Sequence, residues 1–380
     1  MGIIEKESPV TKNRSSSSTE NFWFQQITDQ NVIDLNGYAD FMLSMVSRTF
    51  ALNIRILPKK LKHEILLAYL FCRIADTIED DKMLESEAKV FLLDQYQLLF
   101  DQNDNWSESI ERFVHQLPVS WKSERNWDQL LTWHCKWIFS LFFKLHPASR
   151  NAISHWVKEM CEGMKLFARH ETDKESKNVI IADIKDLDRY CYYVAGTVGN
   201  MLCDLFNLHS KFISAHLYDE LKRYAVSFGL GLQLTNILKD VYSDIDRNIM
   251  FIPMAMLKEQ GLTKDSFFDL SNRERSNIIL QQLITKATSH LADALRYTLL
   301  LPRREPGIRL FCLWPLFMAM DTLVLLAQEL HSSSDKKVLK ISKQQVKTII
   351  RQTNCIFWSN HLLQMLFNKK QRLLQHLLSR

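Results

Sequence analysis

Glycine and proline are scarce in this chain, with nine and eight copies among 380 residues. An average composition would supply about 45 of the two residues together. The turns between short strands depend on them, so the shortage argues against all-β, collagen-like and Pro- or Gly-rich low-complexity proteins. Long helices joined by few turns are therefore the expected architecture.

Apolar residues recur at three- and four-residue steps along almost the whole chain from residue 31 onward. This spacing is typical of helices with one buried face, and no alternating run long enough for a strand is present. Pro58 stands where it can open a helix, since proline is favoured in the first turn. Further helices are predicted within 86–103, 125–144, 150–169, 183–207, 212–246, 273–299, 307–330 and 343–378.

The first 20 residues differ from the rest of the chain. They contain four consecutive serines at 15–18, mixed charges and few apolar side chains. Such a segment buries too little apolar surface to offset the entropy lost on ordering. We therefore expect a disordered tail over residues 1–20 and a single all-α domain, a helical bundle, over residues 21–380.

The charge balance and the cysteines limit the classes of partner and the compartment. Lys and Arg exceed Asp and Glu by 48 to 43, which fits anionic ligands or an anionic membrane surface but is too small an excess to indicate nucleic acid. The seven cysteines form no C-x-x-C pair, so neither a disulfide framework nor a zinc site is indicated. No secretory signal pattern is present near the N-terminus. These features predict a cytoplasmic protein.

Two apolar stretches bear on membrane contact. Residues 310–327 are rich in Leu, Phe and Met, but Asp321 and Pro315 interrupt them, and a membrane span needs about 20 apolar residues. We therefore interpret the stretch as a buried helix and expect no transmembrane anchor. Residues 368–380 are basic with interleaved leucines, a pattern that suits peripheral contact with a membrane as well as a solvated helix end.

The first acidic motif begins at Asp76. Asp76, Glu79 and Asp80 stand at i, i+3 and i+4, and therefore on one helical face. Like charges at this spacing weaken a helix by a few tenths of a kcal/mol per pair. Taken alone, the motif is compatible with a solvated acidic helix end as well as with a metal site.

A second acidic stripe favours the metal site. Asn236, Asp240 and Asp244 follow one another at four-residue steps on an otherwise apolar helix. Oxygen ligands from two facing helices suit Mg²⁺, which proteins hold with a few carboxylates together with substrate phosphates. The predicted Mg²⁺ ligands are Asp76, Glu79, Asp80, Asp240 and Asp244. The cations expected to offset the remaining charge of a diphosphate are Arg48, Arg73 and Lys239.

A cluster of small and aromatic residues begins at Tyr190. Glycine costs about 1 kcal/mol in a helix relative to alanine, so Gly196 and Gly199 indicate close packing or the approach of a ligand. Gly229 and Gly231 repeat this feature just before the second acidic stripe. Their Gly-x-Gly is no dinucleotide fingerprint, because no strand precedes it and no third glycine follows.

Taken together, these motifs resemble the squalene and phytoene synthase family, the head-to-head trans-prenyltransferases. The matching segments come in the order and at the spacing of that family and cover most of residues 40–260. These segments are 47–50, 73–81, 162–164, 190–199 and 233–244. Residues 311–323 resemble the squalene synthase branch more than the phytoene synthase branch, and residues 340–343 are weakly similar to a basic loop of that branch.

The resemblance implies an isoprenoid synthase-like, all-α fold with a central cavity and Mg²⁺ held at its mouth by the two acidic motifs. Similar enzymes bind two prenyl diphosphates, ionise one, and join the two through a cyclopropylcarbinyl diphosphate. Squalene synthases then quench a second cation with hydride from NADPH, whereas phytoene and dehydrosqualene synthases lose a proton. The residues suit this chemistry, because metal and cationic side chains can clamp a departing diphosphate and an apolar cavity excludes water from the cation.

The resemblance also assigns roles to individual residues. Tyr190 is the candidate for proton transfer or cation stabilisation, and Tyr193 is the neighbour with which it is most easily confused. The catalytic group is Tyr190, Asp76, Asp80, Asp240 and Asp244. The residues expected to bind substrate are Ser47, Arg48, Phe50, Arg73, Tyr193, Gln233, Asn236 and Lys239. The apolar residues that could line the cavity or simply belong to the core are Phe50, Val194, Leu232, Phe311 and Met318.

Four positions depart from the family pattern. Lys239 replaces the usual Arg, which keeps the positive charge and loses the bidentate contact with phosphate. Ser243 stands where Glu is common, Ile249 where Arg is common, and Phe251 where the aromatic is often Tyr. These departures affect diphosphate binding by the second motif and leave the core aspartates in place.

The sequence therefore predicts a Mg²⁺-dependent enzyme that joins two farnesyl diphosphates, giving squalene with NADPH and dehydrosqualene without it. One alternative is phytoene formation from two geranylgeranyl diphosphates, because the sequence does not show how deep the cavity is. Another is a non-catalytic helical scaffold that binds a partner, which leaves both acidic stripes unexplained. Nucleic acid is not expected as a partner, because the basic residues are dispersed and the predicted groove is acidic.

Overall fold

The computed structural model describes residues 14–28, 34–101, 105–122, 126–169, 181–245, 250–330 and 339–379. The side chains of residues 14–18, 28, 48 and 243–245 lie outside this description. Within the described ranges the chain forms helices and turns and no strand, which confirms the predicted all-α class. That residues 21–380 form a single domain with a central cavity stays a prediction.

The α-helices follow one another along the chain. They are α1 (Arg14–Thr28), α2 (Leu35–Val46), α3 (Arg48–Ile54), α4 (Lys59–Asp80), α5 (Ser86–Leu98), α6 (Trp106–Val114), α7 (Trp127–Trp133), α8 (Cys135–Phe142), α9 (Pro147–Arg169), α10 (Ile184–Cys191), α11 (Thr197–His209), α12 (Ala215–Ile245), α13 (Met254–Glu259), α14 (Arg273–Leu300), α15 (Pro306–Glu329), α16 (Lys343–Ile356) and α17 (Asn360–Leu378). The shorter elements are the 3₁₀ turns η1 (Val119–Lys122), η3 (Ser266–Phe268) and η4 (Leu270–Asn272) and the π-helical turn η2 (Tyr192–Gly196).

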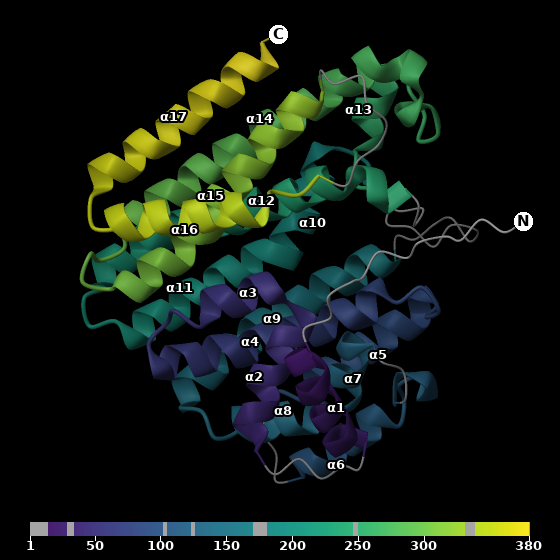
Figure 1. Cartoon of the computed structure of the whole chain (residues 1–380). Helices are drawn as coiled ribbons and strands as arrows, with labels where there is room; N and C mark the ends of the chain where they lie inside the picture. The colour runs from purple at the N-terminus through teal and green to yellow at the C-terminus, as the bar shows by residue number, and fades with distance from the viewer. Residues whose placement is uncertain are drawn as a thin grey trace, which may run out of the picture.

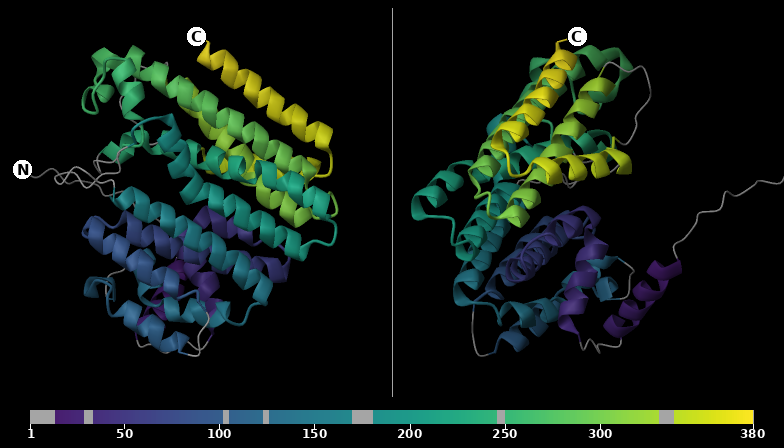
Figure 2. Two further views of the ribbon diagram at one scale, coloured as in Figure 1. Left: turned by 180° about the vertical axis from the view of Figure 1, so that it is seen from behind. Right: turned by 60° about the vertical axis from the view of Figure 1, so that its left-hand side comes forward.

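Early and late helices occupy opposite ends of the molecule. Figures 1 and 2 show the purple and blue helices, α1 to α8, at one end and the green and yellow helices, α14 to α17, at the other. Each end has its own cluster of buried apolar side chains, one built mainly from α2 to α9 and α11 and the other mainly from α10, α12 and α14 to α17. The helices α9, α11 and α12 lie between the two ends (Figure 2). The site described below involves elements of both halves.

Most helix boundaries agree with the apolar spacing. Helix α4 begins at Lys59, directly after Pro58, as the sequence predicts. Two stretches predicted as continuous are each divided: 125–144 at His134, between α7 and α8, and 343–378 just before Ser359. The second division has a local cause, because the Ser359 hydroxyl accepts from the amide of Leu362 at 3.3 Å and so starts a new helix.

Helix α1 begins at Arg14, inside the stretch expected to be a tail, and residues 1–13 lie outside the described residues. The second half of α1 packs against the bundle. The indole of Trp23 stacks on Phe41 with ring centroids 5.6 Å apart, and Ile27 is fully buried. Once this packing fixes part of the helix, each further residue can be added at low cost, since helix propagation is much easier than nucleation.

Helix α15 is long and apolar enough to cross a membrane by length and composition, but 78% of its most apolar window is buried inside the protein. Its Asp321 pairs with Lys370 of α17, and Pro315 lies within the helix. The stretch is therefore the buried helix that the sequence predicts. All seven cysteines are free, and the sequence indicates no disulfide framework. Six of the seven are buried, and Cys355 is exposed.

Candidate active site

The first acidic motif occupies the last turns of α4. Tyr69, Arg73, Asp76 and Asp80 follow at steps of four, three and four residues and so lie along one face of the helix. The C-terminal end of a helix carries partial negative charge, so acidic side chains are unfavourable there unless cations offset them. The motif therefore depends on partners from other elements.

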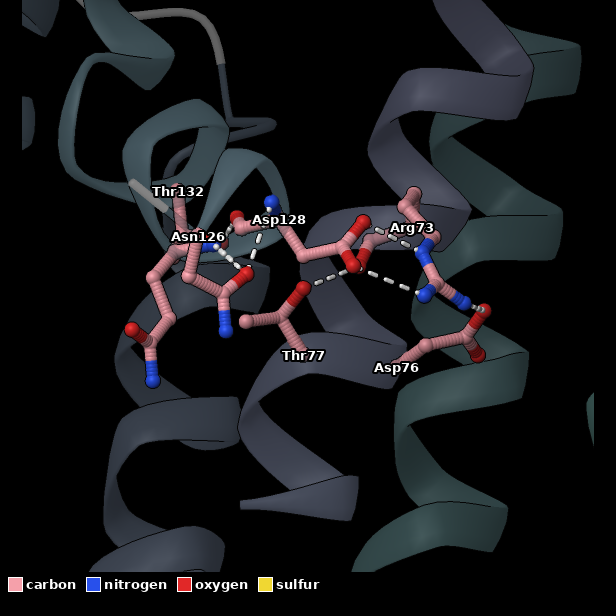
Figure 3. Close-up of polar contacts among 7 residues, drawn as sticks. Arg73, Asp76, Thr77, Asn126, Asp128 and Thr132 are labelled. Atoms are coloured by element: carbon pink, nitrogen blue, oxygen red, sulfur yellow. Dashed lines mark hydrogen bonds and ion pairs between the residues drawn. The ribbon is translucent and has the colours of Figure 1, made fainter. Parts of the chain in front are cut away.

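Arg73 provides the first offsetting charge, and α7 fixes its orientation. The Arg73 Nε donates to Asp128 Oδ1 at 2.7 Å, and a terminal nitrogen donates to Asp128 Oδ2 at 3.0 Å (Figure 3). The other terminal nitrogen lies 3.8 Å from Asp76 Oδ2. The hydrogen bonds that Arg73 donates to Asp128 raise the pKa of Arg73, with a further contribution from Asp76, so Arg73 is a permanent cation.

Asp76 is the perturbed carboxyl group of the motif. Its pKa is raised to about 7, first by burial and then by the negative charge of Asp80, while Arg73 acts in the opposite direction. A third of the Asp76 side chain remains accessible. A carboxylate in this position is short of positive charge, and a bound cation would supply it.

The N-terminal turn of α3 lies beside the same face of α4. The Ser47 hydroxyl caps α3 by accepting from the amide of Phe50 at 3.2 Å. The exposed Phe50 ring lies 5.2 Å from the ring of Tyr69. Burial raises the pKa of Tyr69 to about 12, so its hydroxyl is neutral; hydrogen bonding with Ser47 has the opposite, smaller effect. The structure thus places Ser47 and Phe50 beside Tyr69, which lies one turn of α4 before Arg73. The side chain of Arg48 lies outside the described residues.

Tyr190 of α10 links the acidic end of α4 to the segment that follows α12. Its side chain is buried, stacks on Phe251 with centroids 4.8 Å apart, and meets the edge of Phe167 at 5.2 Å. Burial raises the pKa of Tyr190 well above its ordinary value, and the negative charges of Glu79 and Asp80 raise it further. The phenol is therefore neutral and carries its proton close to the first acidic motif.

The glycines around Tyr190 serve close helix packing. A side chain at Gly163 of α9 would lie 1.9 Å from Cγ of Tyr193, so this glycine makes room for the tyrosine. At Gly199 and Gly229 the added carbon would lie 2.1 and 2.2 Å from a backbone oxygen of the facing helical segment. The π-helical turn η2 falls at this crossing, and such turns are frequent at functional sites. Packing, one of the two predicted explanations, is what the structure shows.

The second acidic motif is held by contacts within α12. Lys239 Nζ lies 3.1 Å from Asp240 Oδ2 and 3.4 Å from Asn236 Oδ1. Asn236 is exposed and Gln233 is half-buried. The side chains of Asp244 and Ser243 lie outside the described residues, as does Ile249. The contacts of Lys239 with Asn236 and Asp240 join neighbours on one helix.

The structure therefore brings together part of the predicted site. Ser47, Phe50, Arg73, Asp76 and Tyr190 form a continuous group along α3, α4 and α10. No three His, Cys, Asp or Glu side chains converge as a preformed metal site within the part of the chain that the structure describes. Of the apolar residues expected near a cavity, Phe311 and Met318 are buried and Val194 and Leu232 are half-buried.

Two further residues that contact this group, Tyr69 and Asp128, are absent from the predicted site. Tyr69 is visible in the sequence as one residue of an apolar helical pattern, but its contact with Phe50 depends on how α3 folds back on α4. Asp128 lies 55 residues from Arg73 along the chain. The start of a helix near Asn126 is a signal that the sequence does contain, since Asn is a favoured cap, but it does not show which residue Asp128 contacts.

The chain matches the squalene/phytoene synthase family model over residues 43–345, and it belongs to that family. It is similar to a squalene synthase of Eremothecium gossypii, with 32% identity over 75% of this chain and 60% of that protein. It is also 30% identical to a squalene synthase of Saccharomyces cerevisiae and 29% identical to squalene synthase 1 of Arabidopsis thaliana, over 75% and 76% of this chain and 60% and 64% of those proteins. The chain thus spans about three-fifths of the length of these curated relatives.

Solved structures share the fold. The complex of TcSQS with the ligand E5700 matches with a TM-score of 0.70 at 22% identity, covering 91% of this chain and 99% of that one. A dehydrosqualene synthase in complex with a ligand matches with a TM-score of 0.56 at 19% identity, covering 90% of this chain and 99% of that one. At these identities the likeness concerns the fold alone, and it agrees with the isoprenoid synthase-like architecture expected from the sequence.

Proposed function

We propose that this protein is a prenyltransferase that joins two farnesyl diphosphates head to head through a cyclopropylcarbinyl diphosphate. The product is squalene when NADPH supplies hydride and dehydrosqualene when it does not. The observation that carries the proposal is the buried, neutral Tyr190 beside the carboxylates of α4, in a chain of the squalene/phytoene synthase family. The phenol of Tyr190 can supply a proton, and the carboxylates at the C-terminal end of α4 can bind a cation.

In this proposal each element of the site has a chemical task. Arg73 and Lys239 offset negative charge on the diphosphates. Tyr190, kept neutral by its raised pKa, donates a hydrogen bond or holds a proton near the departing diphosphate. Buried apolar side chains around the site exclude water, which would otherwise capture a carbocation.

Magnesium fits the donor set on the α4 side. Asp76, Glu79 and Asp80 offer only oxygen ligands, and the raised pKa of Asp76 marks a local shortage of positive charge. Asp240 and Asp244 of α12 would complete the ligands. When bound, Mg²⁺ would supply Lewis-acid neutralisation of the leaving diphosphate. For NADPH, exposed Lys340 and Lys343 before and at the start of α16 match the negative charge of its phosphates.

Product analysis tests the proposal directly. The purified full chain is incubated with farnesyl diphosphate and Mg²⁺, with and without NADPH, and the lipid extract is analysed. We expect a C30 hydrocarbon, squalene with NADPH and dehydrosqualene without it, and none when a chelator removes the metal. The absence of any C30 product under both conditions would contradict the proposed function.

A parallel incubation with geranylgeranyl diphosphate tests the chain length of the substrate. A C40 product formed faster than the C30 product would favour phytoene synthesis, the alternative with the same fold. A protein that forms neither product and whose melting temperature is unchanged by Mg²⁺ with pyrophosphate would instead fit the non-catalytic scaffold, because a ligand that binds the folded state stabilises it.

We also propose that the outer face of α16 and α17 contacts an anionic membrane surface. Residues 336–380 contain ten Lys or Arg and no Asp or Glu, so the other 335 residues hold 38 of the 48 basic residues and all 43 acidic ones. Four large apolar side chains of this region are more than a third exposed. They are Trp358, Leu362, Met365 and Leu373. A basic surface with exposed apolar side chains is typical of helices that lie in the membrane interface.

The helical positions place both kinds of residue on one face of α17. Leu362, Met365, Lys369, Arg372 and Leu373 follow at steps that keep them on one side of the helix, and all are exposed. Figures 1 and 2 show α17 at the outer edge of the molecule, far from α6. The face can therefore approach a flat surface without hindrance from the rest of the bundle.

Vesicle sedimentation tests this contact. We expect the protein to bind vesicles of phosphatidylcholine with phosphatidylserine and not vesicles of phosphatidylcholine alone. Lys369→Glu with Arg372→Glu should weaken binding at least about tenfold, because each basic residue near such a surface contributes about 1 kcal/mol. Arg112→Glu on α6 is the matched control and should bind as wild type. Equal binding to both vesicle types, or no effect of the double reversal, would contradict the proposal.

A further inference from the structure

Arg73 is held more tightly by a residue outside the acidic motif than by the motif itself. Two of its nitrogens contact both carboxylate oxygens of Asp128 at 2.7 and 3.0 Å, while its remaining nitrogen lies 3.8 Å from Asp76 (Figure 3). A guanidinium is planar and rigid, so fixing one edge also fixes the direction of the third nitrogen. Asp128 thereby determines where the positive charge of Arg73 points.

Asp128 is itself held firmly in the first turn of α7. The side chain of Asn126 caps this helix by accepting from the amide of Asp128 at 3.1 Å, and the Thr132 hydroxyl donates to the Asp128 carbonyl at 2.9 Å. The next residue, Gln129, donates to Asp81 Oδ2 at 3.3 Å, just beyond the end of α4. Consecutive residues of α7 thus hold both ends of the segment that carries the acidic motif.

Without Asp128, the side chain of Arg73 would be free to turn toward Asp76. Arg73 and Asp76 are one turn apart on α4, and an unrestrained Arg side chain at that spacing pairs directly with the carboxylate. Such a pair would occupy the Asp76 oxygens. With Asp128 taking two of its nitrogens, Arg73 instead stays 3.8 Å away and leaves Asp76 able to accept a cation.

We propose that Asp128 is a positioning residue for the reaction. By binding the Nε edge of Arg73, it keeps the guanidinium beside Asp76 without closing on it, so that both can engage the metal–diphosphate ligand. This inference rests on the proposed prenyltransferase function. It adds a residue from α7 to a site otherwise built from α3, α4, α10 and α12.

The test compares the full-length variants Asp128→Asn and Asp128→Glu with wild type in farnesyl diphosphate turnover at varied Mg²⁺. Residues that orient the ligands of a metal without touching the metal themselves typically contribute 10- to 100-fold in metal affinity or activity. We therefore expect Asp128→Asn to raise the KM for farnesyl diphosphate and the Mg²⁺ concentration for half-maximal rate by about tenfold, with a smaller change in kcat. Asp128→Glu keeps both carboxylate oxygens and should recover part of the loss.

The matched control is Asp40→Asn. Asp40 also pairs with a cation of α4, since its Oδ1 lies 3.0 Å from Nζ of Lys62, but Lys62 is near the start of the helix, far from the acidic motif. It should leave KM and the Mg²⁺ requirement unchanged. A readout without turnover is the rise in melting temperature with Mg²⁺ and inorganic pyrophosphate, which Asp128→Asn should reduce and Asp40→Asn should not.

A double-mutant cycle separates positioning from a purely structural role. If Asp128 acts through Arg73, Asp128→Asn should add little to the effect of Arg73→Ala on KM and on the pyrophosphate shift. Additive losses in the two variants, or an Asp128→Asn protein that behaves like Asp40→Asn, would overturn the inference. A wild-type protein without any prenyl product would instead refute the proposed function, and the pyrophosphate shift would still test the role of Asp128.

Discussion

The two acidic motifs resemble each other in sequence and differ in how the fold holds them. The motif at the end of α4 interacts with other elements: Asp128 of α7 accepts two hydrogen bonds from Arg73, and the charges of Glu79 and Asp80 act on Tyr190 of α10. The described part of the motif on α12 is held by Lys239, which lies 3.1 Å from its own neighbour Asp240. Contacts between helices fix a side chain relative to the whole fold, whereas contacts within one helix move with that helix. The α4 motif is therefore the half of the site whose charge is oriented by another helix, whereas the Lys239–Asp240 pair lies within α12.

The largest expected difference concerns activity. Asp76→Ala should lower kcat/KM about 10³-fold and Asp240→Ala about 10²-fold, because preorganised charge in a site contributes about 10² to 10³ per group. Steady-state rates of C30 product formation measure both losses. Equal losses would show that preorganisation of the α4 motif has no bearing on catalysis.

The second expected difference concerns packing beside the two motifs. Gly163→Ala places a carbon 1.9 Å from the ring of Tyr193, whereas Gly231→Ala on α12 meets the side chain of Leu291 at 2.9 Å. Overpacking costs about 1–3 kcal/mol, so we expect Gly163→Ala near the upper end of that range and Gly231→Ala near the lower end. The free energy of unfolding in urea measures both. The comparison fails if Gly231→Ala is the more destabilising change.

A third difference appears in the pH dependence of stability without divalent metal. The pKa of Asp76 is raised to about 7, so the folded state binds a proton that the unfolded state releases near pH 4. Stability is then greatest below the unfolded pKa and falls as pH rises from about 4 to 7, by about 1–2 kcal/mol, since partial exposure screens the charge. Urea unfolding in chelator at several pH values measures this fall.

The matched variants for this measurement are Asp76→Asn and Asp240→Asn. Asp76→Asn removes the titrating group and should flatten the dependence, while Asp240→Asn should retain it. The free energy of unfolding of Asp76→Asn is subtracted from that of the wild type at each pH. If the difference rises with pH over this range, the assignment to Asp76 is refuted.

The smallest expected effect belongs to Lys239. Lys239→Arg restores a planar group that can bind a phosphate through two nitrogens. The Lys239–Asp240 pair is partly exposed and contributes about 0–1 kcal/mol, so its replacement should hardly change the free energy of unfolding. We expect the KM for farnesyl diphosphate to fall by about threefold or less at unchanged stability. A rise in KM would mean that lysine at this position is adapted to the ligand.

Much of the fold could be predicted from the sequence, because helix formation and amphipathic burial are local properties. The spacing of apolar residues placed α4, α9, α12, α14 and α15 to within a few residues. The divisions at His134 and before Ser359 were not predicted, because the apolar pattern runs on through both. The helical start of α1 at Arg14 also departs from the composition of its serine-rich segment.

The candidate site was predicted in its residue types and only partly in its arrangement. Asp76, Arg73 and Tyr190 could be chosen from motifs in the sequence, and the structure groups them. The glycines at 199 and 229 were recognised as costly, and only the structure shows that each makes room for a particular neighbour. The space that Gly163 leaves for Tyr193 was not predicted. The ligand roles of Asp240 and Asp244 stay predictions.

The sequence by itself determined the helical class, the family motifs and the two acidic stripes, because each depends on residues within a few turns of one another. The tertiary structure decided that Asp128, 55 residues from Arg73, would orient it, and that Tyr190 would lie beside Glu79 and Asp80. Contacts of this kind depend on how whole helices pack, and helix packing is a property of the complete core. The sequence therefore identifies the charged groups, and the packing of α4 against α7 sets the direction of the Arg73 charge.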